Sequence, residues 1–363
     1  MEVALLGAHR TYNFGDLLLA HIYARWVRET VPHAQLSLPY ASKDIAASLG
    51  YSEPEFARGL LRADKVLFIG GGYFGEKQNP TWRDQLVRFH RYMYPGLTAL
   101  AANKDVGVIG VGFGPLSSSL LRRSARFILN HAQIVALRDK ESREYAQEYG
   151  VKHGHIRVTA DAALALKWSD LGSVSVSTAE ALLQRTPPDA RIGVHLSNLS
   201  DSSAAYDAVL HDIQLHIQEH PRHHAYLLCD QRGSVGQQKM QNRLQSTLGH
   251  RATSLGYQDP EILSAVLGRL CVVVTDKLHV GMVARVLGTP SVSVANHQKT
   301  ARLYKQLDAS ADCVAIDQVE SGFVHSALQR LMMSGRYEVP PAVVELANEN
   351  KRLVRDFLVG PTL

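Results

Sequence analysis

Short apolar runs rich in β-branched residues alternate with longer helical stretches along the first half of the chain. The clearest predicted strands are residues 3–6, 65–69, 106–111 and 134–137. An amphipathic helical segment, 17–30, follows the first strand, and helix-compatible segments follow the others. Strands that alternate with helices are typical of βαβ units around a parallel sheet.

The same pattern restarts in the second half of the chain. Strands are predicted at 192–196, 225–228, 270–275 and 291–294, with helices between them that include 259–267 and 278–287. Residues 167–191 contain Ser-Val-Ser-Val-Ser, a short helical stretch and Thr186-Pro187-Pro188-Asp189, a composition typical of a linker. Pro340-Pro341 opens a last helical segment that reaches to about Phe357.

The prediction is therefore an α/β protein with two Rossmann-like domains that face a central cleft. We expect an N-terminal domain at 1–170, a C-terminal domain at 190–340, and a helix at 341–363 that packs back on the first domain. The length of 363 residues suits two domains, and 45% apolar with 20% charged residues is ordinary for globular proteins.

The start of the chain predicts a strand and not a secretion signal, because 1–6 lacks a basic lead and its apolar run is short. No apolar run approaches the roughly 20 residues of a spanning helix. Cys229, Cys271 and Cys313 lie far apart without CxxC spacing, which indicates buried thiols in a reducing compartment. We expect a cytoplasmic protein, at most at the inner face of the membrane.

The charge favours anionic partners. The net charge is +5 and the pI is about 9.0, but the basic residues are scattered and not interleaved with aromatic residues. This favours phosphate or carboxylate substrates, or an anionic membrane surface, over nucleic acid.

Glycines and polar residues follow several predicted strands, where ligands bind in open parallel sheets. In the first half these motifs are Asn13-Phe14-Gly15-Asp16, Gly70-Gly71-Gly72, Gly110-Val111-Gly112-Phe113-Gly114-Pro115, Arg138-Asp139 and Asp161. Each also has a purely structural interpretation: a helix cap and turn, tight glycine turns, a structural Arg-Asp clip, and a cap. No motif matches a dinucleotide fingerprint or a Walker A loop.

The second half offers Asp276-Lys277-Leu278-His279 after the strand at 270–275. A lysine and a histidine at a helix N-terminus can stabilise an anion and exchange protons near neutral pH, although a lone helical histidine is more often structural. His216 and His220 have the i, i+4 spacing of some metal sites, but their polar surroundings and the missing HExxH order favour a solvated helix face. No Asp-x-Asp motif is present, and we expect no metal.

Taken in order, these motifs, together with Gly288-Thr289-Pro290, resemble the polysaccharide pyruvyl transferase family. The similarity extends from the first strand to Lys299. The resemblance implies a GT-B-like fold and transfer of the carboxyvinyl part of phosphoenolpyruvate onto two hydroxyls of a sugar, as a ketal. Phosphoenolpyruvate would be a co-substrate, with no other cofactor.

The resemblance also implies roles for individual residues. His279 would carry the acid/base step with Lys277 beside it, and Lys277 and Arg138 would hold anionic groups. The further substrate-binding candidates are Asn13, Asp16, Gly71, Gly72, Gly112, Gly114, Asp161, His195, Ser197 and Lys299. The acceptor would be a saccharide, lipid-linked or nucleotide-linked, and peripheral membrane contact and a homo-oligomer are further expectations.

The chain departs from the family pattern at two places. Lys277-Leu278-His279 stands where the family commonly has Arg-Leu-His, and lysine lacks the planar two-point grip of arginine on a carboxylate. His195, Ser197 and Asn198 stand after the first strand of the second half, where family members often carry an arginine. Two alternatives therefore stay open: a metal-independent glycosyltransferase that uses a nucleotide sugar, and a non-catalytic binding protein with the same fold.

Overall fold

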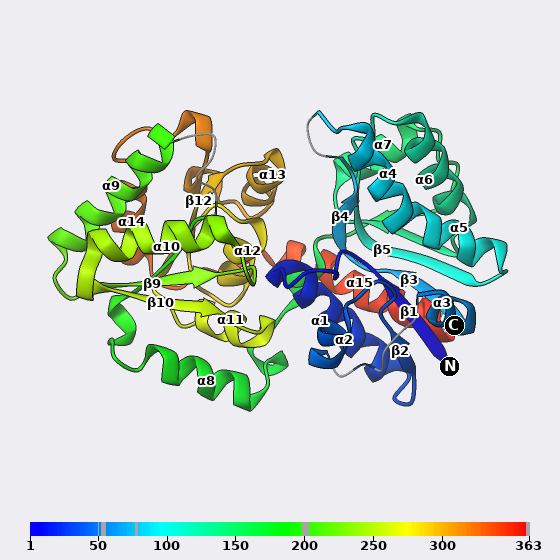
Figure 1. Ribbon diagram of the computed structural model, residues 1–363, viewed down its shortest axis with the longest axis horizontal. Coiled ribbons are helices and arrows are strands. Elements are labelled where there is room, and N and C mark those ends of the chain that lie inside the picture. The colour runs from blue at the N-terminus through cyan, green and yellow to red at the C-terminus, as the bar shows by residue number, and fades with distance from the viewer. Residues whose placement is uncertain (50, 52–55, 77–78, 198–202, 361–363) are drawn as a thin grey trace. The chain divides into compact units, whose positions relative to one another are not determined.

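The chain forms two compact α/β units, each with a parallel sheet flanked by helices (Figure 1). The computed structural model describes residues 1–49, 51, 56–76, 79–197 and 203–360. The first unit comprises Met1–Tyr12, Asp16–Ala165 and Val344–Leu363, and the second comprises Asn13–Gly15 and Leu166–Val343. The short segment Asn13–Gly15 thus belongs to the second unit, although the sequence places it in the first.

The sheet of the first unit has the strand order β2-β1-β3-β5-β6-β7, with β4 paired to β5. Its strands are β1 (Glu2–Leu6), β2 (Gln35–Ser37), β3 (Lys65–Phe68), β4 (Gly71–Phe74), β5 (Asp105–Phe113), β6 (Ile134–Leu137) and β7 (Ile156–Val158). Its helices are α1 (Phe14–Thr30), α2 (Lys43–Ser48), α3 (Phe56–Arg62), α4 (Trp82–Arg88), α5 (Tyr94–Ala101), α6 (Ser119–His131), α7 (Lys140–Glu148) and α15 (Pro341–Val359), with a π-helical turn at Phe89–Met93. Every strand pair is parallel, as the βαβ pattern predicts.

Both glycine-rich motifs of the first unit lie mostly within strands. β5 continues to Phe113, two residues beyond its predicted end, and so includes Gly110 and Gly112, and Gly71 and Gly72 open the strand β4. Gly110 has a φ of +71°, and a Cβ there would come within 2.2 Å of the Tyr23 hydroxyl, which donates to the carbonyl of Ile109. Glycine is therefore required by backbone conformation and by packing.

The last helix, α15, packs on the first unit from Val344 onward. The buried Asn350 amide donates to the carbonyl of Ala160 at 2.9 Å, and Arg157 pairs with Glu349. The ring of Phe357 lies against the backbone of Gly107 in β5. These contacts join the end of the chain to the middle strands of the first sheet.

The sheet of the second unit has the strand order β10-β9-β8-β11-β12-β13. Its strands are β8 (Arg191–His195), β9 (His224–Cys229), β10 (Ala252–Tyr257), β11 (Val272–Thr275), β12 (Ser291–Ala295) and β13 (Cys313–Ala315). Its helices are α8 (Ser173–Leu183), α9 (Ser203–Glu219), α10 (Val235–Leu248), α11 (Pro260–Leu267), α12 (Leu278–Val286), α13 (Gln298–Gln306) and α14 (Phe323–Ser334). Buried valines of β11 and β12 pack with apolar residues of α9, α10 and α14 as the core.

Two expectations about the second unit need correction. The predicted linker contains α8, whose buried Ala179 and Leu183 belong to this unit, whereas Val174 near its start is 76% exposed. The cysteines are free thiols, but each is only partly buried.

Gly110→Ala should destabilise the protein by roughly 2–4 kcal/mol, because the new Cβ adds a left-handed backbone penalty to a clash with Tyr23. Urea unfolding measures the difference. Gly154→Ala is the matched control, since no atom lies within 4 Å of the position of its Cβ. Equal unfolding free energies for the two variants would contradict the packing argument.

Candidate functional site

The strand order of the second sheet reverses between β8 and β11. From β8 the chain proceeds outward to β9 and β10, and from β11 it proceeds in the other direction to β12 and β13. Ligands of open α/β sheets bind at such a switch point, beyond the carboxyl ends of the strands. The residues that directly follow β8, β9, β11 and β12 therefore form the candidate site.

Asp276, which follows β11, collects hydrogen bonds from three neighbouring segments. Its carboxylate accepts from the Ser197 amide at 2.7 Å and the Tyr206 hydroxyl at 2.8 Å. The Asn296 amide, after β12, donates to it at 3.4 Å. Burial disfavours the charged carboxylate, but the hydrogen bonds and charge of His195 and the Ser197 amide outweigh it and lower the pKa of Asp276.

His195, the last residue of β8, lies fully buried between two aspartates. Its Nε2 is 3.1 Å from Asp230, and its Nδ1 is 3.4 Å from Asp276. Burial alone would lower the pKa of His195, but the two carboxylates outweigh it and raise this pKa to about 9. Burial alone would raise the pKa of Asp230, but the charge and the hydrogen bond of His195 outweigh it and lower this pKa to about 2. His195, one of the substrate-binding candidates from the sequence, is a charged link between two strand ends with an exposure of 0%.

The segment Asn13–Gly15 packs against Asp230, which follows β9, and against His279. The Phe14 amide donates to the carbonyl of Asp230 at 2.7 Å, and the Asn13 amide lies 3.5 Å from the Asp230 carboxylate. Gly15 lies against His279, because a Cβ at Gly15 would fall 2.1 Å from the ring Nδ1. The motif at 13–16 and the motif at 276–279 are thus brought together, and only glycine leaves space for the imidazole.

Positive charge gathers at the ends of β11 and β12. Lys277 caps α12, whose first turn carries the half-buried His279. Lys299 lies in the first turn of α13. The pKa of His297 is lowered mainly by burial and further by the positive charges of Lys299 and Lys277. Both lysines therefore lie near this imidazole. The first turns of two helices and two lysines suit an anionic group.

The first-unit candidates are placed differently. Gly112 and Gly114 leave room for side chains of their own unit, because a Cβ would come within 2.7 Å of Arg138 and 2.5 Å of the Tyr145 ring respectively. The buried Arg138 lies 3.3 Å from Asp161 and 3.6 Å from Asp139, which is the geometry of the structural clip. Asp161 also caps the turn at Ala163.

The remaining first-unit candidates lie at strand and helix starts. Asp16 is in the first turn of α1, close enough to Tyr73 and Tyr92 for its charge to raise their pKa values, although burial contributes most. Gly71 has a φ of +120° and pairs with Val111, and Gly72 follows it in β4. Asn198 lies outside the described residues.

Sequence reasoning missed Asp230, Tyr206, Asn296 and His297. Asp230 directly follows the buried strand β9, so the rule that identified Asp161 could have found it. Tyr206 lies in the interior of α9, and no local signal identifies it.

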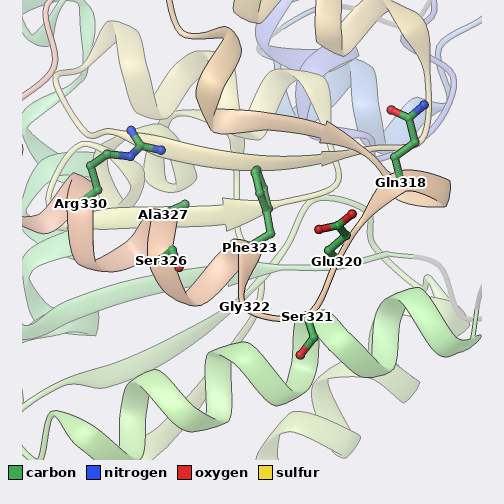
Figure 2. A pocket seen from close by; sticks show the side chains of 8 residues that line it. All are labelled: Gln318, Glu320, Ser321, Gly322, Phe323, Ser326, Ala327 and Arg330. Atoms are coloured by element: carbon green, nitrogen blue, oxygen red, sulfur yellow. The ribbon is translucent and has the colours of Figure 1, made fainter.

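Two further features lie apart from these residues. A pocket lined by Gln318, Glu320, Ser321, Gly322, Phe323, Ser326, Ala327 and Arg330 surrounds the start of α14 and includes no sequence-predicted site residue (Figure 2). His216 is buried against His220 and His223, so the prediction of a solvated helix face is wrong for it. In the described part of the chain, no helix has the length and apolarity needed to cross a membrane.

His195 should make stability fall at alkaline pH. Its pKa is raised from 6.5 to about 9, so its contribution is complete below pH 6.5 and is lost as pH rises through 9. This loss should amount to roughly 3 kcal/mol in the unfolding free energy of the wild type, and His195→Gln should lack it. Urea unfolding at a series of pH values measures both.

NMR titration of the His195 imidazole in the wild type provides a second measurement, which does not require the variant to fold. A pKa at or below the ordinary histidine value would refute the proposed charge on this ring.

Similarity to known proteins agrees with this architecture. A search of curated protein sequences gave no match. The UDP-GlcNAc 2-epimerase of Methanocaldococcus jannaschii has a TM-score of 0.68 at 11% identity, over 98% of this chain and 99% of that one. The enzyme from Neisseria meningitidis, bound to UDP-GlcNAc, has a TM-score of 0.65 at 11% identity, over 99% and 100%. At this identity the likeness concerns the fold, which is GT-B-like.

The family model for polysaccharide pyruvyl transferase matches residues 13–298. This span contains the residues described above at the carboxyl ends of the strands in the second sheet, from Asn13 to Asn296. The chain therefore belongs to the polysaccharide pyruvyl transferase family of transferases.

Proposed function

We propose that the protein transfers the carboxyvinyl part of phosphoenolpyruvate to a saccharide and forms a pyruvyl ketal. The observation that carries the proposal is the half-buried His279 at the start of α12, between the cation Lys277 and the segment Asn13–Gly15. The family match supports the reaction class. The saccharide is lipid-linked or nucleotide-linked, and the reaction takes place in the cytoplasm or at the inner face of the membrane.

The reaction needs proton transfer and charge neutralisation. A sugar hydroxyl oxygen forms a bond to C2 of phosphoenolpyruvate while a proton is added to C3, which becomes the methyl group. A second hydroxyl of the sugar then bonds to C2 as the C2–O bond to phosphate breaks, and phosphate leaves with the electron pair. One hydroxyl proton balances the proton that C3 gains, and the other leaves with phosphate or solvent.

In this proposal His279 donates the proton to C3 and accepts one from the attacking hydroxyl. Lys277 and Lys299 hold the carboxylate and phosphate as point charges, since lysine does not form the two-point grip of arginine. No metal is required by this scheme. His195, Asp230 and Asp276 do not contact the donor in it, and they hold the segments that carry Lys277 and Asn13.

A nucleotide sugar is the second candidate donor. The fold neighbour from Neisseria meningitidis was solved with UDP-GlcNAc, and Lys277 replaces the arginine that the family commonly carries. Thermal shift separates the two donors, because a ligand at 100 times its dissociation constant adds about 2.7 kcal/mol to stability. Stabilisation by UDP sugars and not by phosphoenolpyruvate would favour the glycosyltransferase alternative.

His279→Gln should reduce acceptor-dependent phosphate release from phosphoenolpyruvate by roughly 10²–10⁴-fold, the usual contribution of general acid/base catalysis. The assay uses a panel of lipid-linked and nucleotide-linked glycans. His250→Gln, at an exposed histidine in the same unit, is the control and should keep wild-type activity. Wild-type rates in His279→Gln, or no release with any acceptor by the wild type, would overturn the proposal.

Lys277→Ala should weaken phosphoenolpyruvate binding, and Lys277→Arg should preserve or strengthen it, because arginine restores the two-point contact. Isothermal titration of each variant with phosphoenolpyruvate measures the dissociation constants. Unchanged affinity in Lys277→Ala would remove this lysine from the donor site.

A further inference from the structure

Four histidines gather where α9 ends, in the second unit. The rings of His216 and His220 stack at a centroid distance of 4.4 Å, and those of His220 and His223 at 4.8 Å. The ring of His325, from α14, meets His216 edge-on at 5.8 Å. His216 is 1% exposed, and His220 and His223 are partly buried. Imidazoles are seldom packed together in this way for apolar burial alone, because each brings polar nitrogens that need partners.

The nitrogens of three of these rings converge. One ring nitrogen each from His216, His220 and His223 lie within 4.8 Å of one another. The closest pair, His216 Nε2 and His223 Nδ1, is 3.1 Å apart. Two nitrogens bound to one tetrahedral Zn²⁺ at about 2.0–2.1 Å would be about 3.3 Å apart.

Hydrogen bonds to backbone carbonyls orient the ring of His220 and the turn that follows it, as is usual around metal-ligating histidines. His220 Nδ1 lies 2.9 Å from the carbonyl of His216, an outer hydrogen bond that leaves Nε2 to face inward. Arg251 donates to the carbonyls of His220 and His223 and so fixes the turn between them. His216 lacks such an outer hydrogen bond, because its buried Nδ1 has no partner among the residues that the structure describes.

We propose that His216, His220 and His223 bind a divalent transition-metal ion of the zinc class, with water in the fourth position. Imidazole nitrogens bind such ions in the neutral form. The carboxylate of Glu219, 3.3 Å from His325, adds negative charge beside the cluster.

Binding requires a small rearrangement of the side chains. A metal lies in the plane of each ligand ring, whereas the rings of His216 and His223 are 17° from parallel and stacked. Metal binding therefore requires the partly buried side chains of His220 and His223 to rotate out of the stack. The backbone can stay in place, because Arg251 holds the carbonyls and not the rings.

The location indicates a structural role. α9 leaves the carboxyl end of β8 and reaches the amino end of β9, where His223 directly precedes the strand. The cluster therefore lies at the edge of the sheet opposite His279 and Lys277. A bound ion would join the end of α9 to the start of β9 without contact to the candidate active site, so this inference does not depend on the proposed transferase activity.

Competition between the full-length protein, freed of metal, and a chromophoric chelator for Zn²⁺ tests the site. We expect one equivalent to bind and to raise the melting temperature. His220→Ala/His223→Ala should bind at least 100-fold more weakly, since even the loss of an outer-shell partner costs about 10–100-fold. His211→Ala removes an exposed histidine of the same helix and should bind as the wild type does.

Co²⁺ provides a test that does not depend on the variants folding, because a tetrahedral imidazole site gives a visible absorption band with the wild type. Absence of the band together with absence of stoichiometric Zn²⁺ binding would overturn the proposal, as would equal affinity in the double variant and the wild type. If His279→Gln still binds the metal ion, metal binding at the cluster is independent of the proposed transferase activity.

Discussion

The arrangement of the second unit depends on a protonated histidine buried between two aspartates. An unpaired charge that is buried this deeply has a high cost in free energy. His195, Asp230 and Asp276 are tolerated as ions only together, because the charge on the histidine compensates the charges on the two aspartates. Because the three residues end or follow three different strands, their mutual attraction sets the spacing of β8, β9 and β11 where the polypeptide turns toward the candidate site. The outer hydrogen bonds from Ser197, Tyr206 and Gln237 satisfy the remaining oxygens.

This buried charge bears on one of the departures from the family pattern that the sequence indicated. At the end of the first strand of the second half, where the resemblance implies an arginine, the chain has His195, whose pKa of about 9 makes it an enclosed cation. The positive charge is kept, but it is used to organise the strand ends and not to meet a ligand. Lys277 and Lys299 then remain as the exposed or half-buried cations at the ends of β11 and β12.

Much of the fold could be predicted from local pattern, because the central strands are rich in valine, leucine and isoleucine. β3, β6, β9 and β12 begin and end within two residues of their predicted bounds. The edge strands β2, β10 and β13 escaped prediction, since partly exposed strands lack such a pattern. The serine-rich α8 was assigned to a linker, although a short helical stretch was expected there, because its composition does not show that Ala179 and Leu183 pack into the second unit. The position of His279 could be predicted, whereas Tyr206 and the histidine cluster depend on contacts that no local motif records.

The placement of Asn13–Gly15 has a consequence for the modularity of the protein. These residues precede most of the first unit in sequence, yet they pack with the second, where Phe14 donates to Asp230 and Gly15 lies against the His279 ring. A recombinant second half that begins at Leu166 would expose the polar groups that this segment covers, and a first half exchanged with a homologue would bring a foreign segment to His279. Recombination of intact domains at the boundary near 166 therefore alters the candidate site of the second unit, because that unit includes three residues from the start of the chain.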